Sequence, residues 1–527
     1  MNDQSVPSYS VLARIVLAIA VILLAIQTID YINFTVDDVF ISMRVAENAA
    51  AGQGYVYNKG ENVEGFSDPL WVWMLTGAAR LGINRSMSPL ALMWFAKALS
   101  YFFGLCSLFM VYLLAKKIFV GNPRAYFYSA IAVLFGVMCA PFVAWSCGGL
   151  EMTLVAFLFT FAVLHVHNIF ELMRNGQQVP ALQYIAVSGS LLTASLARPE
   201  PLLFATVGFI AIHLLLPKTE KMRFVTIAVA PYLLGMALFF VWRWTTYHDI
   251  LPNTFYAKTG GGIRSYMMGV KYLLGALGSV AAPLLIVMVF AFRPGWRKDQ
   301  FFVFMMAILA TSGFFIIYSS GDWMPGARFL IPIAPMLFII ATMGIERIRE
   351  NFPDSGSGRQ LSLISYVFII GLVSFCCSFA GRVSLRGESP TLRTGFSEQT
   401  GNALPGHTQV AEWLRKNSSG TYSVAAGEAG IIGYMNPNMR LIDLNGLMDR
   451  HIASIRKNSA PFDTKYVLDE KPDFVILYGV SDLATKRVNM GISGNYVGAF
   501  MKESRFLSEY SVVQHFLDFD IYKRNAK

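Results

Sequence analysis

Charged residues are scarce in this chain. Asp, Glu, Lys and Arg make up 14% of its 527 residues, whereas 55% are hydrophobic. Such a composition excludes an ordinary soluble globular protein and favours a polytopic membrane protein. The net charge of +10 comes from Lys and Arg residues spread in short clusters between apolar runs. That distribution is typical of membrane orientation and not of the basic stripe of a nucleic-acid-binding protein.

Cysteines are absent from the polar C-terminal region, and the common nucleotide-binding and catalytic motifs are absent from the whole sequence. The five cysteines lie within or beside apolar runs, and the polar C-terminal region has none. Neither a disulfide framework nor a cysteine zinc site is therefore indicated. The chain has no glycine-rich dinucleotide fingerprint, no Walker pattern, no HExxH and no nucleophile elbow. The sequence thus gives no support to a nucleotide-sugar donor.

Long apolar runs are abundant, and a membrane span needs roughly 20 such residues. The sequence predicts eleven spans, at 11–29, 88–115, 125–143, 151–170, 181–197, 200–216, 223–244, 268–292, 301–318, 328–345 and 361–380. No convincing cleavage site follows the first run, so we expect a retained signal anchor. The apolar core of residues 67–82 is too short to span. We expect an interfacial helix there, with Trp71 and Trp73 at headgroup depth.

Loop charge predicts how these spans are oriented. With the N-terminus inside, the five cytoplasmic loops carry thirteen Lys and Arg residues, as the positive-inside rule requires. The acidic and amide-bearing loops then all fall on the outer side. The sequence therefore predicts a polytopic α-helical membrane domain over residues 1–383, N-in and C-out, whose outer loop 30–87 carries interfacial helices. One outward-facing polar site is the simplest account of the outer loops.

The chain changes character at about residue 384, where charge density rises. The segment VAEWLRKN (410–417) has a helical pattern, while YSVAAG, RLIDLNG and DFVILYG resemble short buried strands. SVVQHFLDFDIYKR alternates like a late pair of strands. We therefore predict a small extracytoplasmic α/β domain over residues 384–527. Within it, LIDLNGLMD is interpreted as a strand-to-turn connection and not as a site.

Asp37 and Asp38 stand side by side at the start of DDVFISMRVAENAAAGQG, where apolar residues recur at helical spacing and AGQG marks the end. A carboxylate at a helix N-terminus is electrostatically favourable, so one of the two could be a cap. Like-charge proximity raises the proton affinity of a second carboxylate, and a general base needs that property. We therefore interpret the pair as catalytic, with capping as the alternative for one member.

Charges that flank predicted spans are further candidates. Glu151 follows two glycines and begins a span, so it could bind substrate or cap the helix. Arg198 and Glu200, in ARPEP, could form a local ion pair or line a water-filled cavity. Lys97 lies within its span and could snorkel outward or meet a lipid phosphate.

Two outer loops carry groups suited to a sugar phosphate. Asn253, Tyr256 and Lys258 offer an amide, an aromatic phenol and a point positive charge, with an ordinary polar loop as the alternative. Asp322 and Arg328 flank the turn in GDWMPGARF. The arginine offers a bidentate fork for a phosphate group or is a snorkelling anchor.

The order of these motifs resembles a known family. DDVFISMRVAEN, GQGYVYNKGENVEGFSDPLW, WSCGGLE, ARPEP, LPNTFYAK and SGDWMPGARFLIP are similar to the GT-C-fold, polyprenyl-phosphate-sugar-dependent glycosyltransferases, and most similar to the mycobacterial terminal β-(1→2) arabinofuranosyltransferases and their bacterial relatives. The resemblance covers residues 30–345 and, more loosely, the C-terminal region through GEAGIIGY and RLIDLNGL.

This resemblance implies an inverting sugar transfer in an outer cavity. One carboxylate of the pair takes the proton of an acceptor hydroxyl while the lipid phosphate leaves; position in the motif favours Asp37 as base and Asp38 as partner. Lys258, Arg328, Arg44 and Arg198 are candidates to stabilise the leaving phosphate. The implied partners are a polyprenyl-phosphate sugar donor, membrane lipids and a glycan or glycoprotein acceptor, without nucleic acid.

The resemblance also sets the expected location and cofactors. It implies a bacterial inner-membrane protein of cell-envelope biogenesis, with an arabinofuranose or another pentose as the sugar. Two carboxylates could hold Mg²⁺ or Mn²⁺ with waters, yet some relatives work without a metal, so no metal site is predicted. A transporter or flippase of lipid-linked sugars remains an alternative, although paired repeat halves are missing. A non-catalytic assembly subunit is the other alternative.

Overall fold

A computed structural model describes residues 9–258, 262–280, 282–292, 295–322, 324, 326–350, 405–457, 461–478, 494–516 and 519–526. The chain divides into two compact units. The first comprises residues 1–34, 97–238 and 265–393, and the second 35–96, 239–264 and 394–527. The predicted outer loop therefore groups with the C-terminal region, whereas the sequence suggested a single boundary at residue 384.

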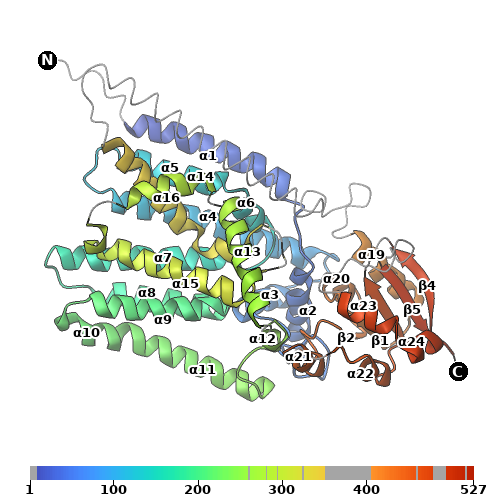
Figure 1. Ribbon diagram of the computed structural model, residues 1–527. Helices are drawn as coiled ribbons and strands as arrows, with labels where there is room; N and C mark the ends of the chain where they lie inside the picture. The colour runs from blue at the N-terminus through green and yellow to red at the C-terminus, as the bar shows by residue number, and fades with distance from the viewer. Residues whose placement is uncertain are drawn as a thin grey trace, which may run out of the picture. The chain divides into compact units, whose positions relative to one another are not determined.

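The first unit is helical, and many of its helices run alongside one another (Figure 1). Its elements are α1 (Tyr9–Tyr31), α4 (Ala91–Ile118), α5 (Ala125–Met138), α6 (Ala140–Cys147), α7 (Met152–Arg174), α8 (Ala181–Ala197), α9 (Glu200–Leu215), α10 (Lys218–Phe224), η1 (Val225–Val229), α11 (Ala230–Tyr247), α13 (Gly262–Val280), α14 (Ala282–Met288), η2 (Val289–Ala291), η3 (Trp296–Lys298), α15 (Gln300–Tyr318), η4 (Arg328–Ile333) and α16 (Ala334–Glu350). Helices α4, α11 and α13 each continue across a boundary between the units.

Ten of the eleven predicted spans coincide with helical segments, and the eleventh, 361–380, lies outside the described residues. Among the described residues, six helices are long and apolar enough to cross a membrane, or seven if one bent pair counts as a span. That pair is α5 and α6, which meet at a 68° bend. Pro141, in the first turn of α6, favours a new helix start over a continuous helix. The predicted span 268–292 is divided among α13, α14 and η2.

Burial distinguishes inner from outer helices of the first unit. The apolar window of the segment Arg328–Glu350, which contains α16, is 83% buried, and that of α7 is 72% buried, whereas that of α1 is 11% buried. Ile15, Val21 and Ile22 of α1 are largely exposed. A helix that exposes such side chains is suited to a lipid environment, so the apolar composition and this packing agree on a multi-pass membrane protein.

The first part of the second unit contains α2 (Asp38–Ala50), α3 (Pro69–Arg80) and α12 (Asn253–Lys258). The predicted helix after the Asp pair is confirmed, and the glycines of AGQG follow its end with positive φ angles of 78° and 84°. Helix α3 occupies the segment predicted to be interfacial, but Trp71 is fully buried. Helices α2 and α3 pack together, and a side chain inside the protein cannot lie at headgroup depth as predicted for Trp71. Trp73 lies edge-on to Trp242, with ring centroids 5.3 Å apart.

The C-terminal part of the second unit is a mixed five-stranded sheet in the order β2-β1-β3-β5-β4. Its elements are α19 (Pro405–Asn417), β1 (Tyr422–Ala426), α20 (Gly430–Met435), β2 (Met439–Asp443), α21 (Arg450–Lys457), α22 (Thr464–Asp469), β3 (Phe474–Tyr478), α23 (Gly494–Phe500), α24 (Ser504–Glu509), β4 (Tyr510–Phe516) and β5 (Phe519–Arg524). Strand β1 pairs parallel with β2 and β3, and β5 pairs antiparallel with β3 and β4. The predicted helix 410–417, the three buried strands and the late strand pair are all confirmed.

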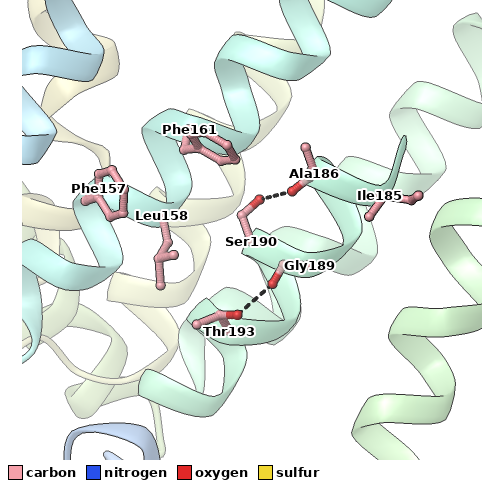
Figure 2. A pocket seen from close by; sticks show the side chains of 8 residues that line it. All are labelled: Phe157, Leu158, Phe161, Ile185, Ala186, Gly189, Ser190 and Thr193. Atoms are coloured by element: carbon pink, nitrogen blue, oxygen red, sulfur yellow. Dashed lines mark hydrogen bonds between the residues drawn. The ribbon is translucent and has the colours of Figure 1, made fainter. Parts of the chain in front are cut away.

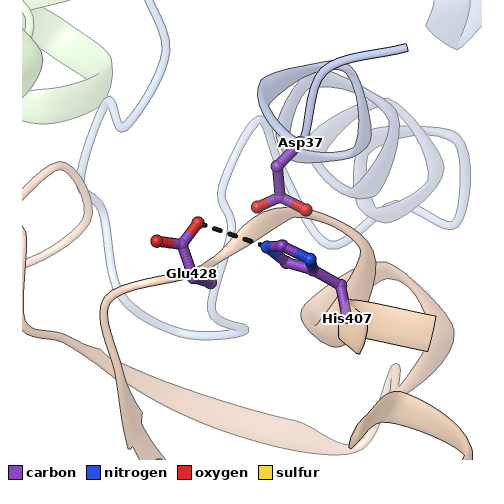
Figure 3. A group of neighbouring side chains, drawn as sticks. All are labelled: Asp37, His407 and Glu428. Carbon is purple, nitrogen blue, oxygen red and sulfur yellow. Dashed lines mark ion pairs between the residues drawn. The ribbon is translucent and has the colours of Figure 1, made fainter. Parts of the chain in front are cut away.

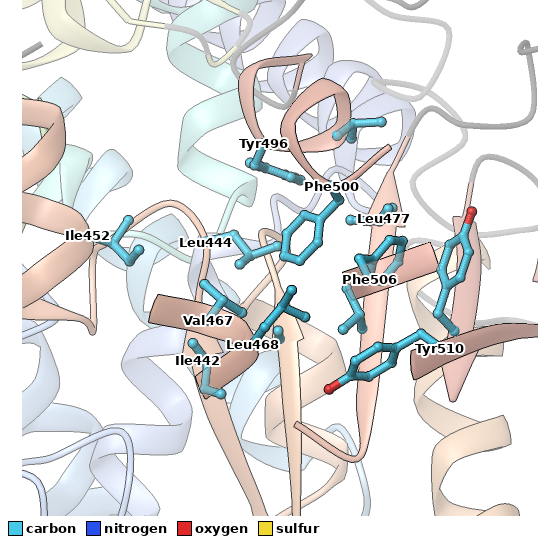
Figure 4. Close-up of a cluster of buried hydrophobic side chains, with 14 residues drawn as sticks. Ile442, Leu444, Ile452, Val467, Leu468, Leu477, Tyr496, Phe500, Phe506 and Tyr510 are labelled. Carbon is cyan, nitrogen blue, oxygen red and sulfur yellow. The ribbon is translucent and has the colours of Figure 1, made fainter. Parts of the chain in front are cut away.

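A compact apolar core holds this sheet to its helices (Figure 4). It includes Ile442, Val475 and Leu477 from the strands and Val467 and Phe500 from the helices, all of them essentially inaccessible to solvent. Burying a side chain of this kind contributes roughly 1.5–3 kcal/mol. The domain therefore has a core of its own. This core fixes the strands and thereby the residues at their ends.

Candidate functional site

Asp37 is the N-cap residue of α2, but its side chain makes no capping bond to that helix. Its carboxylate instead accepts the backbone N–H of Gly430 at 2.6 Å and that of Ile431 at 2.9 Å. These are the first N–H groups of α20, in the C-terminal part of the unit. The alternative that Asp37 caps its own helix is therefore not realised, because its carboxylate caps a helix almost 400 residues further along the chain.

Gly430 is the first residue of α20 and must be a glycine. A Cβ at this position would lie 2.0 Å from the Asp37 carbonyl oxygen and 2.5 Å from its Oδ1. Only a residue without a side chain lets the backbone of α20 approach Asp37 so closely. The contact between the first loop and the C-terminal domain thus depends on this glycine.

Two further titratable side chains lie beside Asp37 (Figure 3). His407 lies in the first turn of α19 and Glu428 follows β1, and His407 Nε2 lies 3.5 Å from Glu428 Oε2. Burial raises the pKa of Asp37 to about 6, while His407 lowers it and Glu428 raises it further. The predicted rise in proton affinity is thus found at Asp37, but its main cause is burial and not the proximity of Asp38 on which the prediction rested.

Asp38 differs from its neighbour in exposure. It is the first residue of α2 and is half-buried, whereas Asp37 is 7% exposed. A carboxylate in the first turn interacts favourably with the helix dipole. Of the two carboxylates, Asp38 is thus the one that solvent and a substrate can more easily reach.

Arg44 was predicted to bind the donor phosphate, but its guanidinium contacts backbone groups instead. Its guanidinium is buried and donates to the carbonyl oxygens of Tyr57 at 3.0 Å, Gly433 at 2.7 Å and Met439. The ring of Tyr57 also lies 4.2 Å from the Arg44 guanidinium carbon. Because these carbonyls occupy its donors, Arg44 ties α2 to the C-terminal domain within the second unit.

The loop YHDILPNTFYAK is likewise attached to the C-terminal domain. Asn253 donates from Nδ2 to the carbonyl oxygens of Gly446 at 2.9 Å and Leu447 at 3.0 Å. Tyr256 donates to Asp249 Oδ1 at 2.8 Å and is half-buried. Lys258 is the last residue of α12. The structure thus gives Asn253 a structural contact, while Tyr256 stays partly accessible.

In the first unit, Glu151, Arg198 and Glu200 form one buried cluster. Arg198 donates from Nε to both Glu200 oxygens, at 2.7 and 2.8 Å, and from Nη1 to Glu151 Oε1 at 2.6 Å. Glu151 does not cap α7, so the capping alternative for it is not realised. Its Oε2 has no hydrogen-bond partner among the described residues. A buried carboxylate oxygen of this kind is suited to accept a bond from a substrate hydroxyl.

Asp322 and Arg328 form a second buried pair in the first unit, with Arg328 Nε 2.6 Å from Asp322 Oδ2 and Nη2 3.1 Å from Oδ1. Phe329 lies between the two clusters, because the guanidinium carbons of Arg198 and Arg328 are 5.7 and 5.4 Å from its ring centre. Five of the predicted charged residues of this unit therefore come together, and Lys97 is not among them. Buried ionisable groups among apolar helices usually mark a functional site.

The Lys97 side chain points inward and not to a lipid surface. It is buried, and its Nζ donates to the carbonyl oxygen of Phe34, within the same unit. The snorkelling alternative is therefore excluded, since a snorkelling ammonium lies in water.

An apolar groove of about 300 Å³ lies between α7 and α8 (Figure 2). Ser190 and Thr193 line it, but their hydroxyls donate to the carbonyl oxygens of Ala186 and Gly189 in their own helix. A binding site needs a few convergent polar groups to orient a ligand. This groove offers apolar surface instead, so it is not a candidate site for a sugar.

Sequence reasoning missed His407 and Glu428, which lie beside Asp37, and the buried pair of Glu64 and Arg243. Glu64 Oε2 lies 2.8 Å from Arg243 Nε. Burial raises the pKa of Glu64 to about 7, although Arg243 opposes the shift. GEAGIIGY contained a signal for Glu428, because it follows a predicted strand. A single histidine before a helix carries no comparable signal.

Comparisons with known proteins agree with this architecture. Residues 394–526 match the family described as Domain of unknown function (DUF8728). The chain is 25% identical, over 373 residues, to the Terminal beta-(1->2)-arabinofuranosyltransferase of Mycobacterium tuberculosis (strain ATCC 25618 / H37Rv). That match covers 64% of this chain and 56% of the relative. The chain thus spans little more than half the length of this curated relative.

Solved structures extend the likeness over almost the whole chain. ArnT from Cupriavidus metallidurans bound to undecaprenyl phosphate has a TM-score of 0.56 at 12% identity, and the match covers 96% of this chain and 97% of that one. The archaeal oligosaccharyltransferase AglB from Archaeoglobus fulgidus, in complex with an inhibitory peptide and a dolichol-phosphate, has a TM-score of 0.53 at 11% identity, covering 89% and 70%. The predicted fold class is confirmed: this chain has the fold of the GT-C membrane glycosyltransferases.

Proposed function

We propose that this protein is a membrane glycosyltransferase that moves a sugar from a polyprenyl-phosphate donor to an extracytoplasmic glycan, lipoglycan or glycoprotein. The observation that carries the proposal is the adjacent carboxylate pair at the start of α2, in a chain with the GT-C fold. The similarity to structures bound to undecaprenyl phosphate and dolichol-phosphate supports a lipid-phosphate donor. The similarity to an arabinofuranosyltransferase supports arabinofuranose or another pentose as the sugar.

The transfer itself needs a base and a leaving group. The acceptor hydroxyl gives its proton to a carboxylate of the pair while its oxygen bonds to the anomeric carbon, and the bond from that carbon to the lipid phosphate breaks with inversion. We assign the base to Asp38 and the supporting role to Asp37, the reverse of the order that the motif implied. The assignment rests on exposure, because Asp38 is half-buried whereas Asp37 is 7% exposed. Both Asp37 oxygens also accept backbone N–H groups of α20.

The donor phosphate needs positive charge, which the described residues provide in the first unit. Arg198 and Arg328 remain our proposed phosphate ligands in this unit, and Lys258 stays a prediction from the sequence. Each arginine is paired with carboxylates, which hold its planar fork in place. Glu151, Glu200 and Asp322 orient these guanidinium groups, and the second oxygen of Glu151 is suited to a sugar hydroxyl. Arg44 is left out because backbone carbonyls occupy it.

Orientation is part of the same proposal. We place the protein in a bacterial cytoplasmic membrane, with the C-terminal domain and the carboxylate pair on the outer face. The loop charges support this orientation, since the loops predicted to be cytoplasmic carry thirteen Lys and Arg residues, as the positive-inside rule requires. A lipid-linked donor then reaches the enzyme from the bilayer.

The test is a transfer assay with the purified chain in nanodiscs. A panel of polyprenyl-phosphate pentoses and hexoses is offered with a glycan acceptor, and mass spectrometry detects the product and the released lipid phosphate. We expect transfer from a pentose donor, and a loss of about 10²-fold or more in Asp38→Asn, because a general base contributes about 10²–10⁴-fold. Asp469→Asn is the control, since Asp469 is largely exposed in the C-terminal domain.

The same assay separates the alternatives. Carrier movement across liposomes without a new glycosidic bond would identify a flippase. Full glycan composition in a deletion strain complemented with the Asp37→Asn, Asp38→Asn double variant would identify an assembly subunit. Either result would overturn the proposed function.

A further inference from the structure

Asp37, His407 and Glu428 form a group whose chemistry goes beyond proton transfer. One ligand atom from each, two carboxylate oxygens and one imidazole nitrogen, lies within 4.8 Å of the others. Figure 3 shows the His407 ring and the Glu428 carboxylate turned toward Asp37. The three residues come from three separate segments of the second unit, at the starts of α2 and α19 and after β1.

The distances suit a bound cation. Zinc ligands lie about 2.0–2.2 Å from the ion, so two ligands of a tetrahedral site are roughly 3.5 Å apart. The present separations thus require only a small inward movement of flexible side chains. With a neutral imidazole, the two carboxylates carry two negative charges, which balance a divalent ion. Both Asp37 oxygens accept one backbone N–H, and each keeps a further lone pair.

The position of the group in the sheet also supports a ligand site. Strand β1 is followed by β2 on one side and has β3 as its parallel neighbour on the other. Glu428 follows the carboxyl end of β1, and the His407 ring lies 6.4 Å from that of Tyr478, the last residue of β3. In open α/β sheets, ligands bind at the carboxyl ends of strands where the strand order reverses.

We propose that Asp37, His407 and Glu428 bind one divalent first-row transition metal ion, Zn²⁺ or Mn²⁺, which fastens the start of α2 to the C-terminal domain. An imidazole together with carboxylates favours these ions over Mg²⁺, which prefers oxygen ligands alone. Such an ion would link Asp37 to residues about 370 and 391 positions further along the chain. It would therefore hold the carboxylate pair in place without taking a role in any bond that the proposed transfer makes or breaks.

The inference is tested without turnover, so its failure and that of the proposed function are distinguishable. The full chain is purified in nanodiscs without a histidine tag, stripped with a chelator and equilibrated separately with Zn²⁺, Mn²⁺ or Mg²⁺. After removal of free metal, inductively coupled plasma mass spectrometry measures the number of metal ions per chain. We expect about one Zn²⁺ or Mn²⁺ per chain and less than about a tenth of that in His407→Ala and Glu428→Gln.

A matched control and a second readout distinguish ligation from folding. His451→Ala removes a histidine from an exposed pair with Asp463, 3.0 Å away in the same unit, and should keep its metal. The metal should raise the Tm of the wild type and of His451→Ala, but not of the two ligand variants, because a ligand stabilises only a protein that binds it. Wild-type protein that binds neither ion, binds Mg²⁺ alone, or binds as much metal as the ligand variants would overturn the inference.

Discussion

Buried charges are neutralised differently in the two units. In the first unit they pair with one another: Arg198 with Glu151 and Glu200, and Arg328 with Asp322. In the second unit many bind backbone groups instead, as when Arg44 donates to carbonyl oxygens. Long helices satisfy their own backbone, so a buried charge among them mostly finds other side chains. Lys97 differs, because it donates to the carbonyl oxygen of Phe34, which lies outside the long helices. The loops and short elements of the second unit offer N–H and C=O groups that need partners.

This difference predicts how each unit loses stability when a buried charge is removed. Removing a charge from the helical unit leaves another charge buried and unpaired, which costs more than the pair contributes. Removing one from the second unit leaves backbone groups unsatisfied and loosens the joint between the first loop and the C-terminal domain. The predictions below separate these effects, from the largest to the smallest.

The largest effect is expected for Arg198→Gln. The change strands the carboxylates of Glu151 and Glu200 in the helical unit without their shared partner. Breaking a buried ion pair costs about 3–5 kcal/mol, so we expect a clear drop in Tm in detergent. Arg174→Gln is the control, because the pair of Arg174 with Glu171 is exposed and is worth about 0–1 kcal/mol. Equal Tm values for the two variants would contradict the ion-cluster interpretation.

Arg44→Met should destabilise the second unit by about 3 kcal/mol, since it leaves several buried carbonyl groups unpaired. Hydrogen exchange should rise in segment 430–442, where Gly433 and Met439 lose their donor. Arg440→Met is a matched control, because Arg440 is partly exposed and pairs with the side chains of Glu61 and Glu470. If exchange rose equally in both variants, Arg44 would not be the specific tie that its contacts indicate.

Asp443 should make the second unit pH-dependent. It is fully buried at the end of β2, where it accepts the backbone N–H groups of Asn445 and Met448. Burial raises its pKa from 3.8 to about 6, although these bonds oppose the shift. A raised pKa means that the folded state favours the protonated acid, so this contribution is fully present below about pH 4 and is lost by about pH 6.

The expected size of that contribution is about 3 kcal/mol, since one pKa unit corresponds to about 1.4 kcal/mol. Stability of wild type relative to Asp443→Asn should therefore fall as the pH rises from about 4 to 6. Thermal unfolding of both proteins across this range measures the difference. A difference that rises with pH would show that the hydrogen bonds, not burial, dominate.

The smallest effect is expected for Gly430→Ala. Its Cβ would collide with Asp37, and overpacking typically costs about 1–3 kcal/mol. Gly77→Ala in α3 is the control, because a Cβ there meets nothing within 4 Å, and alanine favours a helix over glycine by about 1 kcal/mol. We expect the Tm to fall in the first variant and to stay level or rise in the second. A harmless Gly430→Ala would contradict the close approach of α20 to Asp37.

Much of this arrangement could be predicted from local patterns. Apolar runs located helical segments at ten of the predicted spans, and alternation located the strands of the C-terminal domain, because both depend on the pattern within one segment. The Arg198 and Glu200 pair was foreseeable because the two residues lie two positions apart. Arg44 was misjudged because a cation at an outer loop has the same sequence signature whether it meets a phosphate or a backbone carbonyl.

The sequence by itself determined that this is a helical membrane protein with an α/β domain at its end and two adjacent carboxylates at the head of an early helix. Only the tertiary structure decided what those carboxylates meet. Asp37 caps a helix of the C-terminal domain and lies beside His407 and Glu428, while Asp38 stays more exposed. Periodicity acts over a few residues, but partners that lie about 370 to 390 residues apart are chosen by packing, which no local pattern records.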